Sequence, residues 1–122
     1  MPGRLWIAGA LSALVSVAAC GQGEPAGGAS TPADPAKEAV ERGRRLYVAN
    51  CTACHNNDPA LPGAIGPEVA GSSRELLEAR ILRAEYPPGY TPKRSSNAMA
   101  AMPFLEDGID DLTAYLGSVA KP

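Results

Sequence analysis

The residues with the clearest chemistry are the five from Cys51 to His55, which read Cys-Thr-Ala-Cys-His. Two thiols separated by two residues, on one turn of helix, can both reach the vinyl groups of a haem. The histidine that follows directly can then supply an axial nitrogen to the iron. This is the attachment pattern of c-type haem. The sequence therefore predicts one covalent haem c, attached through Cys51 and Cys54 and ligated by His55.

Other uses of a Cys-x-x-Cys pair are disfavoured by counting the available ligands. A structural zinc site needs four ligands, usually cysteine and histidine. The chain contains three cysteines and one histidine, and Cys20 lies in a different kind of segment. A thioredoxin-like redox pair would need a βαβ setting, and no strand pattern surrounds Cys51 and Cys54.

The sixth iron ligand must come from another residue type, because His55 is the only histidine. A methionine thioether is a common partner of histidine at haem iron and raises the reduction potential. Apart from Met1, the candidates are Met99 and Met102. Met102 is followed by Pro103, which restricts the backbone of Met102 just before the final helix. Met102 is therefore preferred, whereas Met99 could simply fill a gap in the core.

The first helix is expected to begin near Lys37 and to lead into Cys51. Its apolar and small residues recur at three- and four-residue spacing, which indicates an amphipathic helix. Gly43 lies inside this segment, where glycine costs about 1 kcal/mol relative to alanine. The missing side chain would let another helix cross closely.

Two further helices follow, separated by irregular segments. One is expected to start at Ser72 or Ser73, because Ser72 and Glu75 match a capping box. The last should run from about Gly108 to Val119, with Asp107 as its candidate N-cap.

The loop between these two helices is long for so small a domain, and loops of this length are usually functional or disordered. It is expected to form one wall of the haem pocket. Tyr86, Tyr90, Lys93 and Arg94 in this loop are candidates for contacts with the haem propionates, although solvated loop charges are the simpler interpretation.

The N-terminal segment predicts export and lipid attachment. Residues 1–19 carry one early charge, Arg4, followed by an apolar run, as in a signal peptide. The sequence up to Cys20 resembles a bacterial lipobox, so Cys20 is expected to be acylated. Residues 20–36 then form a flexible linker rich in Gly, Ala and Pro, and residues 37–122 form the haem domain. The alternative is ordinary cleavage after Ala19, which would leave the protein soluble in the periplasm.

The charge balance disfavours nucleic acid as a partner. Removing Arg4 from the eleven basic residues leaves ten against thirteen acidic residues, a net charge of about −3. Proteins that bind nucleic acid usually carry a basic patch and a basic charge balance.

Residues 37–122 resemble a class I monohaem cytochrome c. The residues that carry the resemblance are Gly43 and Tyr47 in the first helix, Cys51 to His55, Gly66-Pro67, Met102-Pro103 and Tyr115-Leu116. One departure is Asn56, where relatives often have glycine.

This resemblance implies an all-α fold with three to four helices around one haem. It implies that the Pro67 carbonyl accepts a hydrogen bond from the His55 ring, and that Met102 is the second axial ligand. It also implies that the first and last helices cross near Gly43 and Tyr115.

With ligands on both faces of the iron, no position remains open for a substrate. The expected function is therefore not enzymatic. It is the transfer of single electrons between redox proteins, such as a respiratory complex, a periplasmic dehydrogenase or a terminal oxidase, by a carrier lipid-anchored on the periplasmic side of a bacterial membrane. The alternative is a haem subunit fixed within a periplasmic oxidoreductase complex. A gas-binding or peroxidatic haem would need a labile or absent methionine bond.

Overall fold

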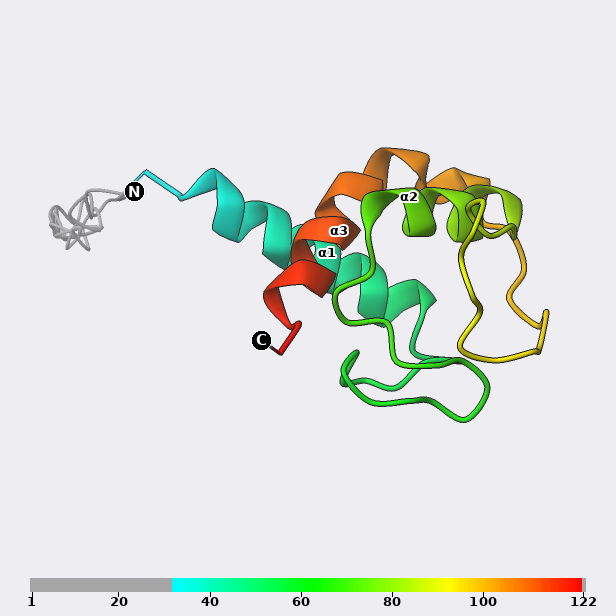
Figure 1. Cartoon of the computed structure of the whole chain (residues 1–122). Helices are drawn as coiled ribbons and strands as arrows, with labels where there is room; N and C mark the ends of the chain where they lie inside the picture. Colours follow the sequence, from blue (N-terminus) through cyan, green and yellow to red (C-terminus); the bar gives the residue numbers. More distant parts are fainter. Residues whose placement is uncertain (1–31, 122) are drawn as a thin grey trace, which may run out of the picture. The chain divides into compact units, whose positions relative to one another are not determined.

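The computed structural model describes residues 32–121 of the 122-residue chain. All regular elements in this range are helical, so the predicted all-α fold is confirmed (Figure 1). In chain order the elements are α1 (Pro35–Asn50), α2 (Arg74–Leu77), the π-helical turn η1 (Glu78–Leu82), the 3-10 helix η2 (Pro103–Gly108) and α3 (Ile109–Ser118). The predicted signal peptide, Cys20 and most of the predicted linker lie outside the described residues. Within residues 32–121, none of the helices has the length and apolar character needed to cross a membrane.

Helix α1 begins two residues before the predicted start at Lys37. Asp34 is its N-cap, and the Asp34 carboxylate accepts a 3.0 Å hydrogen bond from the Ala36 N–H. Pro35 occupies the first turn, where its missing N–H is not needed. The end of the predicted linker is therefore part of the helix, because the Asp-Pro pair is a better start signal than the apolar pattern alone.

Helices α1 and α3 cross each other (Figure 1). At Gly43 the backbone of α1 lies directly against Asp111 and Tyr115 of α3. A Cβ atom on Gly43 would lie 2.8 Å from the Cβ of Tyr115 and still closer to the Asp111 carbonyl oxygen. One turn further along α1, the rings of Tyr47 and Tyr115 pack with their centroids 5.6 Å apart. The expected crossing near Gly43 and Tyr115 is therefore confirmed, and it depends on the absence of a side chain at Gly43.

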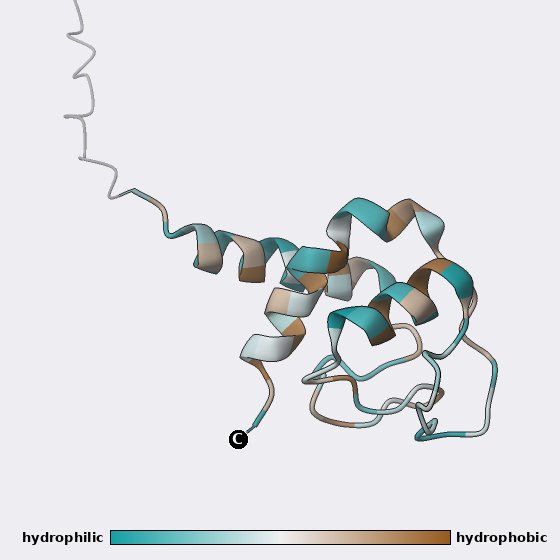
Figure 2. Ribbon diagram, turned by 45° about the horizontal axis from the view of Figure 1, so that its top comes forward, coloured by the Kyte–Doolittle hydropathy of each residue, from teal (hydrophilic) through white to brown (hydrophobic). Residues whose placement is uncertain are grey.

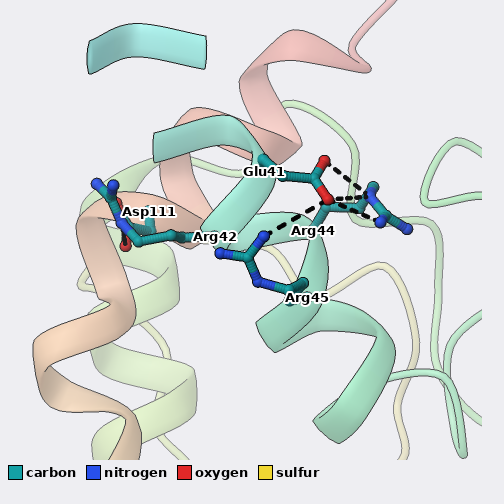
Figure 3. Close-up of polar contacts among 5 residues, drawn as sticks. All are labelled: Glu41, Arg42, Arg44, Arg45 and Asp111. Atoms are coloured by element: carbon teal, nitrogen blue, oxygen red, sulfur yellow. Dashed lines mark hydrogen bonds and ion pairs between the residues drawn. The ribbon is translucent and has the colours of Figure 1, made fainter. Parts of the chain in front are cut away.

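An ion pair flanks this crossing on its exposed side. The Arg42 guanidinium donates two hydrogen bonds to the Asp111 carboxylate, at 2.7 and 2.9 Å (Figure 3). Next to it on α1, Glu41 pairs with Arg44 and Arg45. Exposed pairs of this kind contribute about 0–1 kcal/mol each. The close packing at Gly43, rather than these charges, therefore holds α1 against α3.

The second helical segment begins at a different serine from the one in the predicted capping box. Ser73 is the N-cap of α2, and its hydroxyl accepts a hydrogen bond from the Leu76 N–H. The Ser72 hydroxyl instead donates to the Val69 carbonyl at 2.7 Å, within the preceding loop. The prediction that pairs Ser72 with Glu75 is therefore wrong. The segment continues directly from α2 into the wider π-helical turn η1.

The prediction of Asp107 as the N-cap of the last helix is also wrong. Asp107 lies inside η2, a 3-10 helix that passes straight into α3. Gly108 takes the N-cap position of α3 without any side-chain cap. Since η2 already continues the chain in a helical conformation, α3 needs no separate capping side chain.

One hydrophobic core contains residues from all five elements. Each helix carries both hydrophilic and hydrophobic residues (Figure 2), as expected for amphipathic helices that bury one side. The clustered core residues are Tyr47, Leu77, Ile81, Leu105, Ile109, Leu112, Tyr115 and Leu116.

We predict that Gly43→Ala destabilises the folded holoprotein by about 1–3 kcal/mol, because the added methyl group forces α1 and α3 apart. The matched control is Gly117→Ala in α3, where an added Cβ meets nothing within 4 Å. There the change should stabilise the fold by about 0.4–1 kcal/mol, through the lower entropy of the unfolded chain. Urea denaturation of both variants measures the difference. Equal effects of the two changes would contradict the close crossing.

Candidate functional site

A cavity of about 410 Å³ lies beside the Cys51–His55 turn. Its lining includes Cys51, Cys54, His55 and Met99, together with apolar side chains from α2, η1 and α3. The volume falls within the range of about 300–1,000 Å³ that is typical of small-molecule and cofactor sites. The structure therefore brings both cysteines and the histidine to one cavity.

The end of α1 positions the two cysteines. The Cys51 N–H donates to the Tyr47 carbonyl at 2.8 Å, so Cys51 continues the hydrogen bonding of the helix. The N–H groups of Cys54 and His55 then both donate to the Cys51 carbonyl, at 3.1 and 2.9 Å. The pentapeptide therefore forms a compact turn fixed to the end of α1, as its spacing predicts.

The environment of Cys51 is unlike that of a reactive redox thiol. Burial, followed by the charge that the neighbouring Cys54 would carry, raises the pKa of the Cys51 thiol to about 11. Reactive thiols in redox pairs lie in electropositive surroundings that lower their pKa. Within residues 32–121 no group of three or more His, Cys, Asp or Glu side chains could hold a metal ion directly. Both rival uses of the cysteine pair thus lack support in the described part of the chain.

The His55 ring is held by the loop that follows it. The His55 Nδ1 atom lies 2.8 Å from the Pro67 carbonyl oxygen. A carbonyl accepts only, so Nδ1 carries the proton and Nε2 keeps its lone pair for a metal ion. This is the contact that the resemblance implies for Pro67, and it leaves the imidazole suited to ligate iron.

Gly66 allows this loop to lie against the imidazole. A Cβ atom on Gly66 would lie 2.5 Å from Nδ1 and 2.9 Å from Nε2 of His55, which is closer than real Cβ atoms approach. The Gly66 N–H also donates to the Cys54 carbonyl at 2.9 Å. Gly66 therefore positions His55 in two ways. It leaves room for the imidazole ring, and its N–H binds the carbonyl of the neighbouring Cys54.

The two candidate methionines differ in their relation to the cavity. Met99 lines it, whereas Met102 is not among the lining residues. Both side chains are partly buried and pack against the core. The Met102 N–H donates to the Ile81 carbonyl, which fixes this part of the loop against η1. Its place in the cavity lining makes Met99 a second candidate for the iron ligand, while Met102 stays the prediction from sequence.

The long loop after η1 closes another side of the cavity, as predicted. Its Lys93 pairs with Glu68 at 3.1 Å, and Arg94 donates to the carbonyls of Ile65 and Gly63. These two cations, which the sequence suggested as propionate contacts, tie the loop to the segment that carries Pro67. Tyr86 and Tyr90 line the cavity with them.

Sequence reasoning missed the buried charge in the cavity wall, Arg80 in η1. Arg80 is buried and lines the cavity. It follows the buried Leu77 by three residues, so it lies on the apolar side of its helical segment. A charge on an apolar helical face was the signal in the sequence that could have identified it.

The model of the Cytochrome c family matches residues 40–120, which is more than half of the chain. The chain therefore belongs to the cytochrome c family. Members of this family bind haem c covalently and transfer electrons through it, in agreement with the Cys51–His55 turn. Neither the curated proteins nor the solved structures contain a significant match to the chain. The residues around the cavity fit the haem, because both thiols and a histidine held through Nδ1 by the Pro67 carbonyl meet there.

The buried phenol of Tyr47 should make the stability of the fold depend on pH in the alkaline range. Its side chain is 1% exposed, and its hydroxyl donates to the Asn56 carbonyl at 2.6 Å. Burial, followed by the negative charges that Cys51, Tyr115 and Asp58 would carry, raises the pKa of Tyr47 from 10.0 to about 12. The folded state thus favours the neutral phenol. This contribution to stability is complete below pH 10 and is lost as the pH rises from about 10 to about 12.

We predict that Tyr47→Phe lowers the free energy of unfolding at pH 7 by about 1–3 kcal/mol, since the Asn56 carbonyl loses its donor. Between pH 10 and 12 the variant should lose less stability than the wild type, by at most about 2.7 kcal/mol. Denaturation curves at a series of pH values measure both effects. If the variant and the wild type lose the same free energy of unfolding between pH 10 and 12, ionisation of Tyr47 is not the cause of the loss.

Proposed function

We propose that the protein is a lipid-anchored periplasmic cytochrome that carries single electrons between redox proteins. The observation that carries this proposal is the His55 imidazole, held by the Pro67 carbonyl at the wall of the cavity that both cysteines line. When bound, the haem supplies one-electron exchange between Fe(II) and Fe(III). The chain attaches it through Cys51 and Cys54 and orients the axial nitrogen, while the apolar walls exclude water.

We assign the second axial position to Met99. Its side chain lines the same cavity as His55, and a thioether ligand gives the high potential typical of electron carriers. Met102, which the sequence favours, remains the competing prediction. With either methionine, His55 and the thioether would together hold the iron, which would disfavour binding of a substrate or gas there.

The experiment that tests this function compares Met99→Ala with its matched control, Met102→Ala. We predict that Met99→Ala abolishes the weak sulfur-to-iron absorption at the red end of the oxidised spectrum, lowers the reduction potential and allows the reduced haem to bind carbon monoxide. Met102→Ala should keep the spectrum, because its side chain lies outside the cavity lining. The reverse pattern would assign the ligand to Met102. Ready binding of carbon monoxide by the wild type would contradict the carrier function.

The lipid anchor rests on the N-terminal sequence pattern alone. An acylated Cys20 with a linker of fourteen residues, from position 21 to the start of α1, would tether the haem domain with an r.m.s. reach of about 19–22 Å. Such a tether suits a domain that moves between donor and acceptor proteins at a membrane. A haem subunit of a larger oxidoreductase would instead purify as a stable stoichiometric complex with its catalytic partner.

We predict that Cys20→Ser moves the cytochrome from the membrane fraction to the soluble periplasmic fraction without changing its spectrum. One acyl chain binds a membrane only marginally, whereas two or more hold stably, and a bacterial lipoprotein cysteine carries more than one. Fractionation and the intact mass of the mature protein measure this. A wild-type protein that is soluble and carries no lipid mass would refute the anchor.

A further inference from the structure

The loop between η1 and η2 contains a stretch with no backbone hydrogen bonds of its own. Within residues 91–101, no main-chain N–H or carbonyl group is hydrogen-bonded to another main-chain group in the described part of the chain. Among residues 95–101, Met99 is half-buried and the rest are exposed. Segments with few buried contacts and an exposed backbone open at low cost in free energy. We call residues 95–102 the methionine strap, because it holds both Met99 and Met102.

The methionine strap is held mainly at its two ends. At its far end, the Met102 N–H donates to the carbonyl of Ile81, which is buried in η1. Directly before the strap, the Arg94 guanidinium donates to the Ile65 carbonyl at 3.0 Å and to the Gly63 carbonyl at 3.2 Å. Hydrogen bonds from a charged donor are about twice as strong as neutral ones. Arg94 therefore makes the main contact that fixes the start of the strap.

The carbonyls that Arg94 binds belong to the turn that holds the histidine ring. This turn spans residues 63–67, and its last residue contacts His55 Nδ1. Two of its N–H groups donate to the Cys54 carbonyl, at 2.9 and 3.3 Å, and the Gly63 N–H donates within the turn at 2.9 Å. The turn is thus fixed against the attachment site for the haem, and it gives Arg94 a rigid place to bind.

We propose that Arg94 is a positioning residue for the sulfur ligand of the haem iron. By joining the methionine strap to residues 63–67, it keeps the strap against the cavity, which Met99 lines. This inference rests on the proposed function, since it requires a thioether-ligated haem in the cavity. Lys93 pairs with Glu68 in the same region, but that pair is exposed, and exposed pairs contribute little to stability.

Arg94 therefore controls how often the second axial position of the iron is open. When the Arg94 contacts break, the strap moves about its remaining anchor at Met102 and withdraws the thioether. A small neutral ligand such as carbon monoxide binds only to molecules with an open strap, so its apparent affinity is reduced by the fraction of molecules that is open. The affinity for carbon monoxide thus measures the opening, and it depends little on the charge of the side chain.

The test compares Arg94→Met with Arg83→Met in the purified, reduced holoprotein. Both changes remove one positive charge from the same part of the chain, but the Arg83 side chain is 54% exposed and pairs locally with Glu85. We expect Arg94→Met to bind carbon monoxide about tenfold more tightly than the wild type, because two charge-assisted hydrogen bonds that close the strap are lost. Its sulfur-to-iron absorption in the oxidised state should weaken. Arg83→Met should keep the wild-type affinity and absorption.

Equal affinities of Arg94→Met and Arg83→Met for carbon monoxide would overturn the proposal. If Arg94→Met does not fold, Arg94→Lys takes its place in the comparison. Lysine keeps the charge but lacks the planar fork that binds two carbonyls at once, so its affinity should still exceed that of the wild type. A wild-type affinity in that variant would then overturn the proposal. Failure of the proposed function is a separate result, which would appear as a wild type without covalent haem or without the sulfur-to-iron absorption.

Discussion

The hydrogen bond between His55 Nδ1 and the Pro67 carbonyl is the contact on which the site depends. It fixes the ring of the only histidine in the chain at the cavity wall and favours the tautomer with the proton on Nδ1. The contact forms only because the loop folds back against its own start, with the N–H groups of Ile65 and Gly66 both donating to the Cys54 carbonyl. A side chain at position 66 would occupy the space of the imidazole.

Helices α1 and α3 hold the Cys51–His55 turn and the loop that carries Pro67 in place. Helix α1 ends at Asn50, directly before Cys51, so its crossing with α3 at Gly43 fixes the position of the attachment turn. The loop that carries Pro67 is joined to α3 in turn, because the Gly71 N–H donates to the Leu116 carbonyl at 2.9 Å. Tyr47 connects the helix crossing to the haem turn. Its ring packs on Tyr115 in the core, and its hydroxyl donates to the Asn56 carbonyl just after the turn. The cysteines and the histidine are thus supported from both sides by the same pair of helices.

The sequence predicted the parts of the site that rest on local spacing or on a missing side chain. The Cys51–His55 turn, the helical fold and the close approach at Gly43 all belong to this group. The N-caps of the helices were harder to predict. Ser72 and Ser73 are adjacent and of the same type, and Ser73 becomes the cap because the Ser72 hydroxyl binds the preceding loop instead. Asp107 was wrongly predicted as the N-cap of α3, because the 3-10 helix η2 that precedes α3 has no distinct signal in the sequence.

The features that depend on how the long loop folds could not be read from the sequence. The spacing of Met99 and Met102 is compatible with either sulfur facing the haem, and the path of the loop decides which one lines the cavity. For Arg80 the sequence shows only a charge on the apolar side of a helical segment, and its burial beside Tyr86 depends on the tertiary fold. Long-range packing, rather than local propensity, determines both positions.

The most direct test of the central claim is the amount and attachment of haem in the purified protein. A pyridine haemochrome assay should give one c-type haem per chain, and acidic acetone should leave that haem on the protein. The double variant Cys51→Ser, Cys54→Ser should carry no covalent haem. Haem that acidic acetone extracts from the wild type would contradict covalent attachment at the Cys51–His55 turn, and with it the account of the cavity.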